Sequence, residues 1–422
     1  MFVISQVEKF WWKIPDHRRP LRKWALNWLV FCIKFFVLRF WLVLEFVLVA
    51  PAVLWTILCL VKKSQKVYLT GNGSNISGFI PGIEQELRRR SFEVAEMKKM
   101  VIVTQSPDPN LKVRHIYDQI VTIVGSENRI KRRLYLWAYR LGVRGSVLVE
   151  NKSDPSWEMP SNLWQFSSTD IDVGARFLES YGIDSDDQFA CYAIRTESYY
   201  LRQIERGVKL LPRTVRNPVE SNYLKVVSDI STTKFPVIRM GKDIESAIDP
   251  TLYPNVIDYA SKHRSDFLDV FLLSKCKFLL LGNTGLFWIR AMFQKPTVHC
   301  DLYDVRHQVI SGDIMIFQKL WLKNEQRLAT VSEMLKIGGF YSKESHQGKL
   351  GVELVKNTPE EIFSVCNEID SRIDGNWSTT RQDEELQQKY LDLLLKFSNK
   401  PSWRGGGRVG TQFLRDNQDL LK

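Results

Sequence analysis

Short apolar runs alternate with amphipathic stretches from residue 66 onwards. A short apolar run bounded by glycine, proline or polar residues is typical of a strand in a parallel sheet, whereas apolar residues spaced three and four apart are typical of a helix. The pattern predicts strands at 66–69, 100–104, 119–124, 189–194, 235–239, 278–281 and 297–300. It predicts helices at 83–90, 129–142, 172–181, 218–228, 265–274, 286–293, 358–373, 384–397 and 411–421. This order favours the α/β class, with doubly wound parallel sheets.

The same order of strands and helices begins again at about Gln188. A segment rich in Asp, Pro and Ser, residues 151–163, is predicted to be a loop before it. We therefore expect two Rossmann-like domains, at 67–186 and 187–375. A segment of residues 1–66 precedes them, and a helical tail of residues 376–422 follows. Two such domains would bind a ligand between the carboxyl edges of their sheets.

The segment from Phe278 to Asp301 combines a buried strand, a glycine turn, a helix and a second strand. In the turn, Asn283, Thr284 and Gly285 are candidate ligands of a phosphate, because glycine lets the backbone approach closely and a helix start offers free N–H groups. Asn283 or Thr284 is also suited to cap that helix. An ordinary βαβ unit with a tight turn is the alternative interpretation.

The composition indicates a chain with a substantial core and no metal centre. The 422 residues are 44% apolar and 25% charged, which argues against disorder. The six cysteines form no CxxC pair and the six histidines show no HxxxH or HExxH spacing. We therefore expect reduced cysteines in the core, and neither a bound metal nor a cofactor.

The formal net charge of +12 is concentrated at the start of the chain. Residues 1–66 contain eleven Lys or Arg against three acids. These cations surround apolar segments instead of being spread with aromatic residues over a folded face. The distribution favours anionic lipid as a partner and disfavours nucleic acid.

Two apolar runs, at 24–38 and 40–61, predict association with a membrane through residues 24–61. Basic residues flank them on both sides, and Pro51 interrupts the second run. Basic residues prefer the cytoplasmic side, so a hairpin that enters and leaves on that side is one interpretation. A single span and a buried soluble hairpin remain open. We expect the location to be the inner membrane, with the folded domains in the cytoplasm.

Three arginines stand at or near the ends of predicted strands. Arg195 and Arg239 follow apolar runs directly, and Arg216 lies in a loop beside Asn217. Guanidinium groups at the carboxyl edge of a sheet suit bidentate bonds to a diphosphate, and fixed cations stabilise a departing pyrophosphate without a metal. Salt bridges at the surface or between domains are the alternative role.

Other polar residues near these strands are weaker candidates. Glu197 is a candidate catalytic base, or an ordinary partner of an arginine. The segment that precedes the predicted strand 278–281 contains five candidate contacts to a nucleobase or ribose: Asp258, Tyr259, Arg264, Ser265 and Asp266. Asp266 equally suits the start of a helix. The loop 70–75 lacks the spacing and the lysine of a P-loop, which leaves an acceptor-facing loop or a plain turn.

Several short motifs, taken in order, carry a resemblance to a known family. They are VRN, VIRMGK (which contains Gly241), DYA, RSDFLDVFLL, LGNTGL and GTQFLRDNQDLL. From about Lys66 to its end, the chain resembles an uncharacterised bacterial glycosyltransferase family found with surface-polysaccharide genes. More distantly, IRTE and the segment around LGNTGL are similar to the donor-binding half of α-1,6-fucosyltransferase-type enzymes.

This resemblance implies a GT-B fold, a nucleotide-diphosphate sugar held by the second domain, and transfer without a metal. By the same resemblance, Arg195 corresponds to an arginine that contacts the donor diphosphate, and the turn at Asn283 to Gly285 to a phosphate loop. The chain has one arginine in IRTE where a pair is usual, so the identity of the sugar is not carried over.

We therefore expect a glycosyltransferase whose acceptor is a lipid-linked or surface-polysaccharide precursor. A nucleotide-sugar epimerase or hydrolase on the same scaffold is an alternative. A non-catalytic membrane-bound scaffold is another, and it is favoured if Arg195, Arg216 and Arg239 do not converge on one place.

Overall fold

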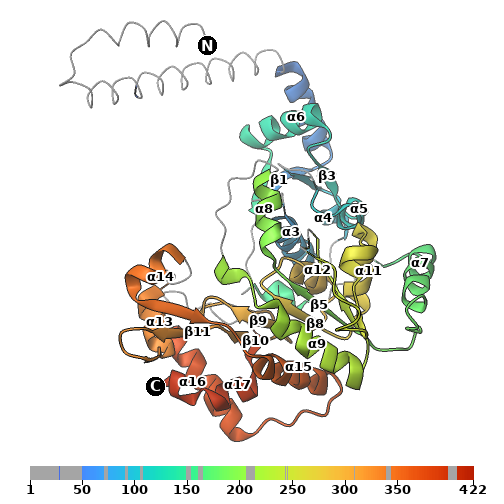
Figure 1. Ribbon diagram of the computed structural model, residues 1–422. Coiled ribbons are helices and arrows are strands. Elements are labelled where there is room, and N and C mark those ends of the chain that lie inside the picture. Colours follow the sequence, from blue (N-terminus) through green and yellow to red (C-terminus); the bar gives the residue numbers. More distant parts are fainter. Residues whose placement is uncertain are drawn as a thin grey trace, which may run out of the picture.

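The protein is a two-lobed α/β structure (Figure 1). The computed structural model describes residues 28, 50–70, 75–90, 94–104, 108–148, 154–159, 165–205, 214–242, 244, 246–307, 309–338, 344–397 and 406–422.

The first lobe is built on a four-stranded parallel sheet of order β3-β2-β1-β4. Its strands are β1 (Lys66–Thr70), β2 (Met100–Val103), β3 (Thr122–Val124) and β4 (Arg144–Leu148). Its helices are α3 (Ile76–Arg89), α4 (Val94–Met97), α5 (Leu111–Asp118) and α6 (Arg129–Arg140), and residues 50–62 form a further helix. Ile102 of β2 packs in one apolar cluster with residues of α3 and α5. Its neighbours Val101 and Val103 pack in another, with Leu60 and Ala138. Both faces of this sheet are therefore covered.

The second lobe is built on a seven-stranded parallel sheet of order β14-β10-β9-β8-β5-β6-β7. The strands are β5 (Ala190–Ile194), β6 (Val237–Arg239), β7 (Val256–Ile257), β8 (Leu279–Gly282), β9 (Thr297–Leu302), β10 (Ile314–Phe317) and β14 (Arg408–Val409). A small antiparallel sheet of order β12-β11-β13 stands beside it, formed by β11 (Lys319–Leu322), β12 (Arg327–Leu328) and β13 (Val352–Val355).

The helices of the second lobe cover both faces of its sheet. They are α8 (Glu197–Glu205), α9 (Glu220–Thr233), α10 (Tyr259–Lys262), α11 (Asp266–Lys275), α12 (Phe287–Met292), α13 (Val331–Ile337), α14 (Glu344–Leu350) and α15 (Pro359–Ile373). In β5, Ala190 and Tyr192 pack in the cluster formed with α9 and α15. Cys191 and Ala193 pack on the other side, with α11 and α12. The two-residue period of a strand produces this split, and the predicted α/β class with parallel sheets is confirmed.

A continuous apolar cluster joins the two lobes. It includes Phe79 and Ile83 of α3 together with Leu272 of α11 and Ile289 of α12. Helix α3 packs against α12, and α5 packs against α11. The segment before β5 belongs to the second lobe by packing, since α7 (Ser168–Glu179) contacts α11. The lobes are thus held together by buried apolar surface.

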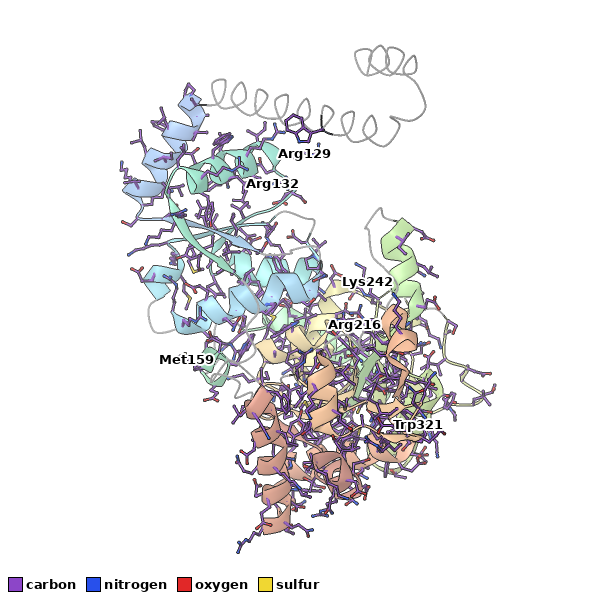
Figure 2. All side chains as sticks on the ribbon, turned by 90° about the vertical axis from the view of Figure 1, so that its left-hand side faces the viewer. Arg129, Arg132, Met159, Arg216, Lys242 and Trp321 are labelled. Atoms are coloured by element: carbon purple, nitrogen blue, oxygen red, sulfur yellow. The ribbon has the colours of Figure 1, made fainter. Side chains whose placement is uncertain are left out.

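A buried arginine reinforces this contact. Arg88 of α3 is fully buried, and its Nη2 donates to the carbonyl of Ala291 at 2.9 Å. Its Nη1 donates to the carbonyl of Trp157 at 3.2 Å, and its Nε donates to Glu84 at 2.9 Å. Figure 2 labels Met159, which follows that tryptophan closely and lies at the boundary between the lobes. A single side chain therefore connects helix α3 with the end of α12.

The C-terminal segment is part of the second lobe. Helix α16 (Arg381–Phe397) packs against α13, and α17 (Thr411–Asp416) packs against α15 and α16. The Nε and Nη2 of Arg415 each donate to a different oxygen of Asp383 at 2.7 Å. β14, between the two helices, pairs with β10. The predicted helical tail thus also supplies an edge strand to the sheet.

Replacing Asp383 with asparagine should lower the melting temperature in a pH-dependent way. The two hydrogen bonds from Arg415 hold the pKa of the Asp383 carboxyl below its usual range. This stabilisation is complete above the unfolded pKa of about 3.9 and is lost as the pH falls below that value. We expect a cost of about 1–2 kcal/mol at pH 7, since Arg415 is partly exposed. Melting curves at pH 7 and pH 3 should show the gap narrowing at the lower pH, and a constant gap would contradict the prediction.

The predicted membrane segment falls mostly outside the described residues, which include only Trp28 and residues 50–61 of it. Within the described part of the chain, no helix is both long and apolar enough to cross a bilayer. Membrane association therefore stays a prediction.

Candidate functional site

The carboxyl edge of the second sheet brings Arg195 and Asn283 into contact. Arg195 follows β5, and its Nε donates to the carbonyl of Asn283 at 2.9 Å. Its backbone N–H donates to the carbonyl of Gly282, the last residue of β8. Asn283 has a φ of 55°, a left-handed conformation that asparagine tolerates better than most residues. Its side-chain amide donates to the carbonyl of Asp301 at 2.7 Å. The predicted turn is therefore fixed by bonds to two neighbouring strands.

Asp301, in β9, holds this edge together. Its Oδ1 accepts from the backbone N–H of Asn357 at 2.8 Å, and its Oδ2 accepts from the hydroxyl of Tyr223 at 3.1 Å. Burial raises the pKa of the Asp301 carboxyl. Gln318 donates both to the carbonyl of Asp301 and to that of Val215, each at 2.8 Å. The loop before α9 is thereby attached to the end of the sheet.

Arg216 and Asn217 stand on that loop, and each has a polar atom without a partner. The Nε of Arg216 and the Oδ1 of Asn217 are shielded from solvent and make no hydrogen bond to the described residues. The Nη2 of Arg216 donates to the hydroxyl of Tyr303 at 2.5 Å, and its Cζ lies 4.7 Å from the centre of that ring. Figure 2 shows Arg216 in the part of the second lobe nearest the first. A held guanidinium with an unused donor is suited to an anionic ligand.

The turn after β8 meets the first lobe. A Cβ added to Gly285 would lie 3.7 Å from the backbone nitrogen of Ser77 in the first turn of α3. At Gly282 an added Cβ would lie 3.1–3.2 Å from atoms of Ile194, Pro218 and Tyr223, so only glycine fits easily. The Oγ1 of Thr284 accepts from the N–H of Leu286 at 3.2 Å, but Leu286 is itself the N-cap residue of α12, so neither Asn283 nor Thr284 caps that helix. The start of α3 and this turn thus face each other between the lobes.

Arg239 does not join Arg195 and Arg216 through its hydrogen bonds. It is 2% exposed, and its guanidinium donates to Glu220 at 2.6 Å and to the carbonyl of Ser246 at 2.7 Å. These contacts match the salt-bridge alternative. Gly241, with a φ of 152°, lies on the segment after β6. Glu197 is exposed in the first turn of α8.

Four of the five residues predicted to contact nucleobase or ribose, namely Tyr259, Arg264, Ser265 and Asp266, make hydrogen bonds around the start of α11. Ser265 caps that helix, and Arg264 donates to Asp266 and to Asp269, each at 2.7 Å. Asp266 also accepts from the N–H of Leu111 in the first lobe at 2.8 Å. The hydroxyl of Tyr259 donates to Asp269 at 2.9 Å.

Asp258 lies apart from that group. It is 7% exposed and accepts from the N–H of Ile248 and from the hydroxyl of Ser261. Asp269, which accepts from Tyr259 and Arg264, is buried, and burial raises the pKa of its carboxyl to about 6. All five side chains have protein partners, although the Oδ1 of Asp258 and the Nε of Arg264 make no hydrogen bond to the described residues. Their contact with nucleobase or ribose stays a prediction.

The sequence interpretation missed four residues at this edge: Asp301, Tyr303, Gln318 and Lys356. The Nζ of Lys356 donates to the carbonyl of Val215 at 2.8 Å, which places a third cation beside the loop of Arg216. Asp301 and Tyr303 adjoin the end of a predicted strand, and that position was a usable signal. Gln318 and Lys356 lie by strands that the pattern did not reveal.

The described residues contain no cluster of metal-ligating side chains and no disulfide. There, no group of three or more His, Cys, Asp or Glu side chains is arranged to hold a metal ion. Cys191, Cys276, Cys300 and Cys366 are buried free thiols. Cys59 is exposed, and for this residue the expectation of a core position is wrong.

These features define a mixed α/β protein with two parallel sheets and a cationic site at the carboxyl edge of the second. No family model matches the sequence, and no curated protein does. Among solved structures, ADP-heptose lps heptosyltransferase II of E. coli is 13% identical with a TM-score of 0.37, over 56% of this chain and 84% of that one. A glycosyl transferase family 9 protein from Veillonella parvula is 10% identical with a TM-score of 0.38, over 57% and 80%.

Two further structures extend the comparison. The iron-containing dodecameric glycosyltransferase TibC of E. coli is 11% identical with a TM-score of 0.32, over 58% of this chain and 59% of that one. The wall teichoic acid polymerase TagF is 11% identical with a TM-score of 0.28, over 84% and 89%. These likenesses are too distant to assign a function, and none of the four is named as a fucosyltransferase. The resemblance to that type stays a prediction.

Proposed function

We propose that the protein is a glycosyltransferase of the GT-B type. In this proposal, the second lobe holds a nucleotide-diphosphate sugar, and the acceptor is a lipid-linked or surface-polysaccharide precursor. The observation that carries the proposal is the shielded Nε of Arg216, which has no partner in the described chain, at the edge where Arg195 and Lys356 are also fixed. A buried donor without a partner is costly unless a ligand satisfies it.

The chemistry follows from the charge of the leaving group. As the bond between sugar and diphosphate breaks, negative charge develops on the departing phosphate oxygen. Cations already fixed by the fold stabilise that charge without having to reorganise. Arg195 is held by Asn283, and Arg216 by Tyr303. We infer that these groups replace a metal ion, and that Glu197 accepts the proton of the acceptor hydroxyl.

The proposal includes a location. Residues 24–61 would hold the enzyme at the cytoplasmic face of the inner membrane, where a lipid-linked acceptor is available. The loop 70–75, most of which lies outside the described residues, precedes α3 in the sequence. We propose that this loop contacts the acceptor.

Nucleoside diphosphates should raise the melting temperature of the full chain. A ligand present at one hundred times its dissociation constant stabilises the fold by about 2.7 kcal/mol. We would measure melting curves with ADP, UDP, GDP, CDP and TDP, using the matching nucleosides as controls without phosphate. One diphosphate should give a clear shift that its nucleoside does not reproduce. If millimolar concentrations of all five leave the melting temperature unchanged, the proposal fails.

A further inference from the structure

The end of the first lobe farthest from the second lobe combines exposed apolar and basic side chains. Figure 1 shows α6 at this end, beside the helix of residues 50–62. We call this surface the distal face. Its apolar members are Leu54, Trp55, Leu58 and Val61, and its basic members are Lys62, Lys63, Arg129, Lys131 and Arg140.

The helix of residues 50–62 has one buried side and one exposed side. Leu60 is 1% exposed and shares an apolar cluster with Ala138 of α6. On the opposite side, Leu54, Trp55 and Leu58 are 59%, 70% and 63% exposed. Four large apolar side chains in a row on one helix face are unusual for a surface in contact with water alone.

Helix α6 supplies charge of one sign. Arg129 and Lys131 are exposed in its first turn, and Arg140 is exposed at its end. No Asp or Glu occurs in residues 128–149 or in residues 46–83. The nearest acid before α6, Glu127, pairs with Arg114 and accepts from the N–H of Gly125.

We propose that the distal face binds the surface of an anionic phospholipid bilayer. The apolar side of residues 50–62 would lie among the headgroups, and the cations of α6 would contact lipid phosphates. Apolar and basic side chains on adjoining helices are typical of interfacial helices. Nucleic acid would satisfy the cations but not the exposed leucines and tryptophan. The inference adds α6 to the membrane contact expected from residues 24–61, and it does not depend on the transferase activity.

Charge reversal at the start of α6 provides the test. The variant Arg129→Glu/Lys131→Glu should retain its fold, because both side chains are exposed and acidic residues suit the first turn of a helix. Each cation near an anionic surface contributes roughly fivefold to binding. We therefore expect at least about a 30-fold loss of partition onto vesicles of phosphatidylglycerol and phosphatidylcholine for the two changes together.

Lys262→Glu/Lys389→Glu is the matched control. It makes the same change of charge at exposed lysines of the second lobe, and we expect its partition to equal that of the unchanged protein. Vesicles of phosphatidylcholine alone should bind the unchanged protein and the α6 variant equally, because only the apolar contact remains. Flotation in a density gradient measures how much of each full-length protein partitions onto each kind of vesicle.

Three outcomes would overturn the inference. One is unchanged binding of the α6 variant to anionic vesicles, as expected if residues 1–49 cover the distal face. Another is an equal loss in the control, which would show that total charge alone matters. The third is binding of an oligonucleotide that the α6 variant loses while vesicle binding stays the same. If the variant does not fold, equal partition of the unchanged protein onto anionic and neutral vesicles would also refute it.

Discussion

Replacing Arg216 with methionine should weaken nucleoside diphosphate binding roughly 10- to 100-fold, because one charge-assisted hydrogen bond contributes about 1.5–3 kcal/mol. Methionine preserves a long apolar stem beside the ring of Tyr303, whose centre lies 4.7 Å from the guanidinium carbon. Turnover should fall further, by about 10²- to 10³-fold, if the guanidinium stabilises the departing diphosphate. Isothermal titration with the diphosphate that shifts the melting temperature, and rates with the matching nucleotide sugars, would measure both effects.

The matched control is Arg381→Met, which removes a guanidinium that is 93% exposed on the start of α16. It should bind and turn over like the unchanged protein. The melting temperature of the Arg216 variant should stay within a few degrees, because the Nε of Arg216 has no hydrogen bond to the described residues and the bond lost from its Nη2 goes to the hydroxyl of Tyr303. Normal affinity and turnover in a folded Arg216 variant would show that this arginine does not serve the donor. A large drop in stability would give it a structural role instead.

Replacing Arg88 with methionine should destabilise the protein by about 3–5 kcal/mol, the usual cost of removing one partner of a buried ion pair. Glu84 is 1% exposed and would lose its ion-pair partner while keeping its charge, although the hydroxyl of Tyr117 would still donate to it at 3.0 Å. The carbonyls of Trp157 and Ala291 would lose their hydrogen bonds as well. Urea unfolding followed by tryptophan fluorescence should report the loss, since the ring centres of Trp157 and Trp288 lie 5.2 Å apart beside this site.

Arg89→Met, one position further along α3, is the appropriate comparison. Arg89 is 48% exposed, whereas its partners Glu86 and Asp154 are 10% and 9% exposed, so its loss should cost less than that of Arg88, about 1–2 kcal/mol. The double variant Arg88→Met/Glu84→Gln should recover part of the lost stability, because it removes the uncompensated charge. Equal effects of Arg88→Met and Arg89→Met would mean that the buried arginine does not hold the lobes together.

The sequence predicted the central strands well, for a simple reason. β5 and β8 are covered on both faces, so each is a nearly continuous apolar run that stands out from its surroundings, and β9, although it contains polar residues, begins directly after Pro296. β11 was missed because its burial alternates along Lys319–Leu322, and four residues are too few to establish a period. β14 has two residues and follows a run of glycines, which gives no signal of a strand.

The candidate site shows the same division. Arg195 and Asn283 were predicted because they follow strands that the pattern revealed, and the edge of a parallel sheet brings such residues together. Arg239 also follows a predicted strand, but its guanidinium donates a hydrogen bond to Glu220, the first residue of α9. Lys356 follows β13 of the antiparallel sheet, and its Nζ donates to the carbonyl of Val215, which is distant in the sequence. No local pattern could indicate that contact.

The sequence alone determined the α/β class, the positions of the main strands and the concentration of positive charge near the start of the chain. These depend on hydrophobic periodicity and on the order of residues, which are local properties. Only the tertiary structure decided that Arg216 keeps an unused donor at the candidate site, which side chains join the lobes, and which apolar residues of 50–62 are exposed. Each of these depends on partners distant in sequence, such as Tyr303 for Arg216 and Ala291 for Arg88, and burial is decided by such partners.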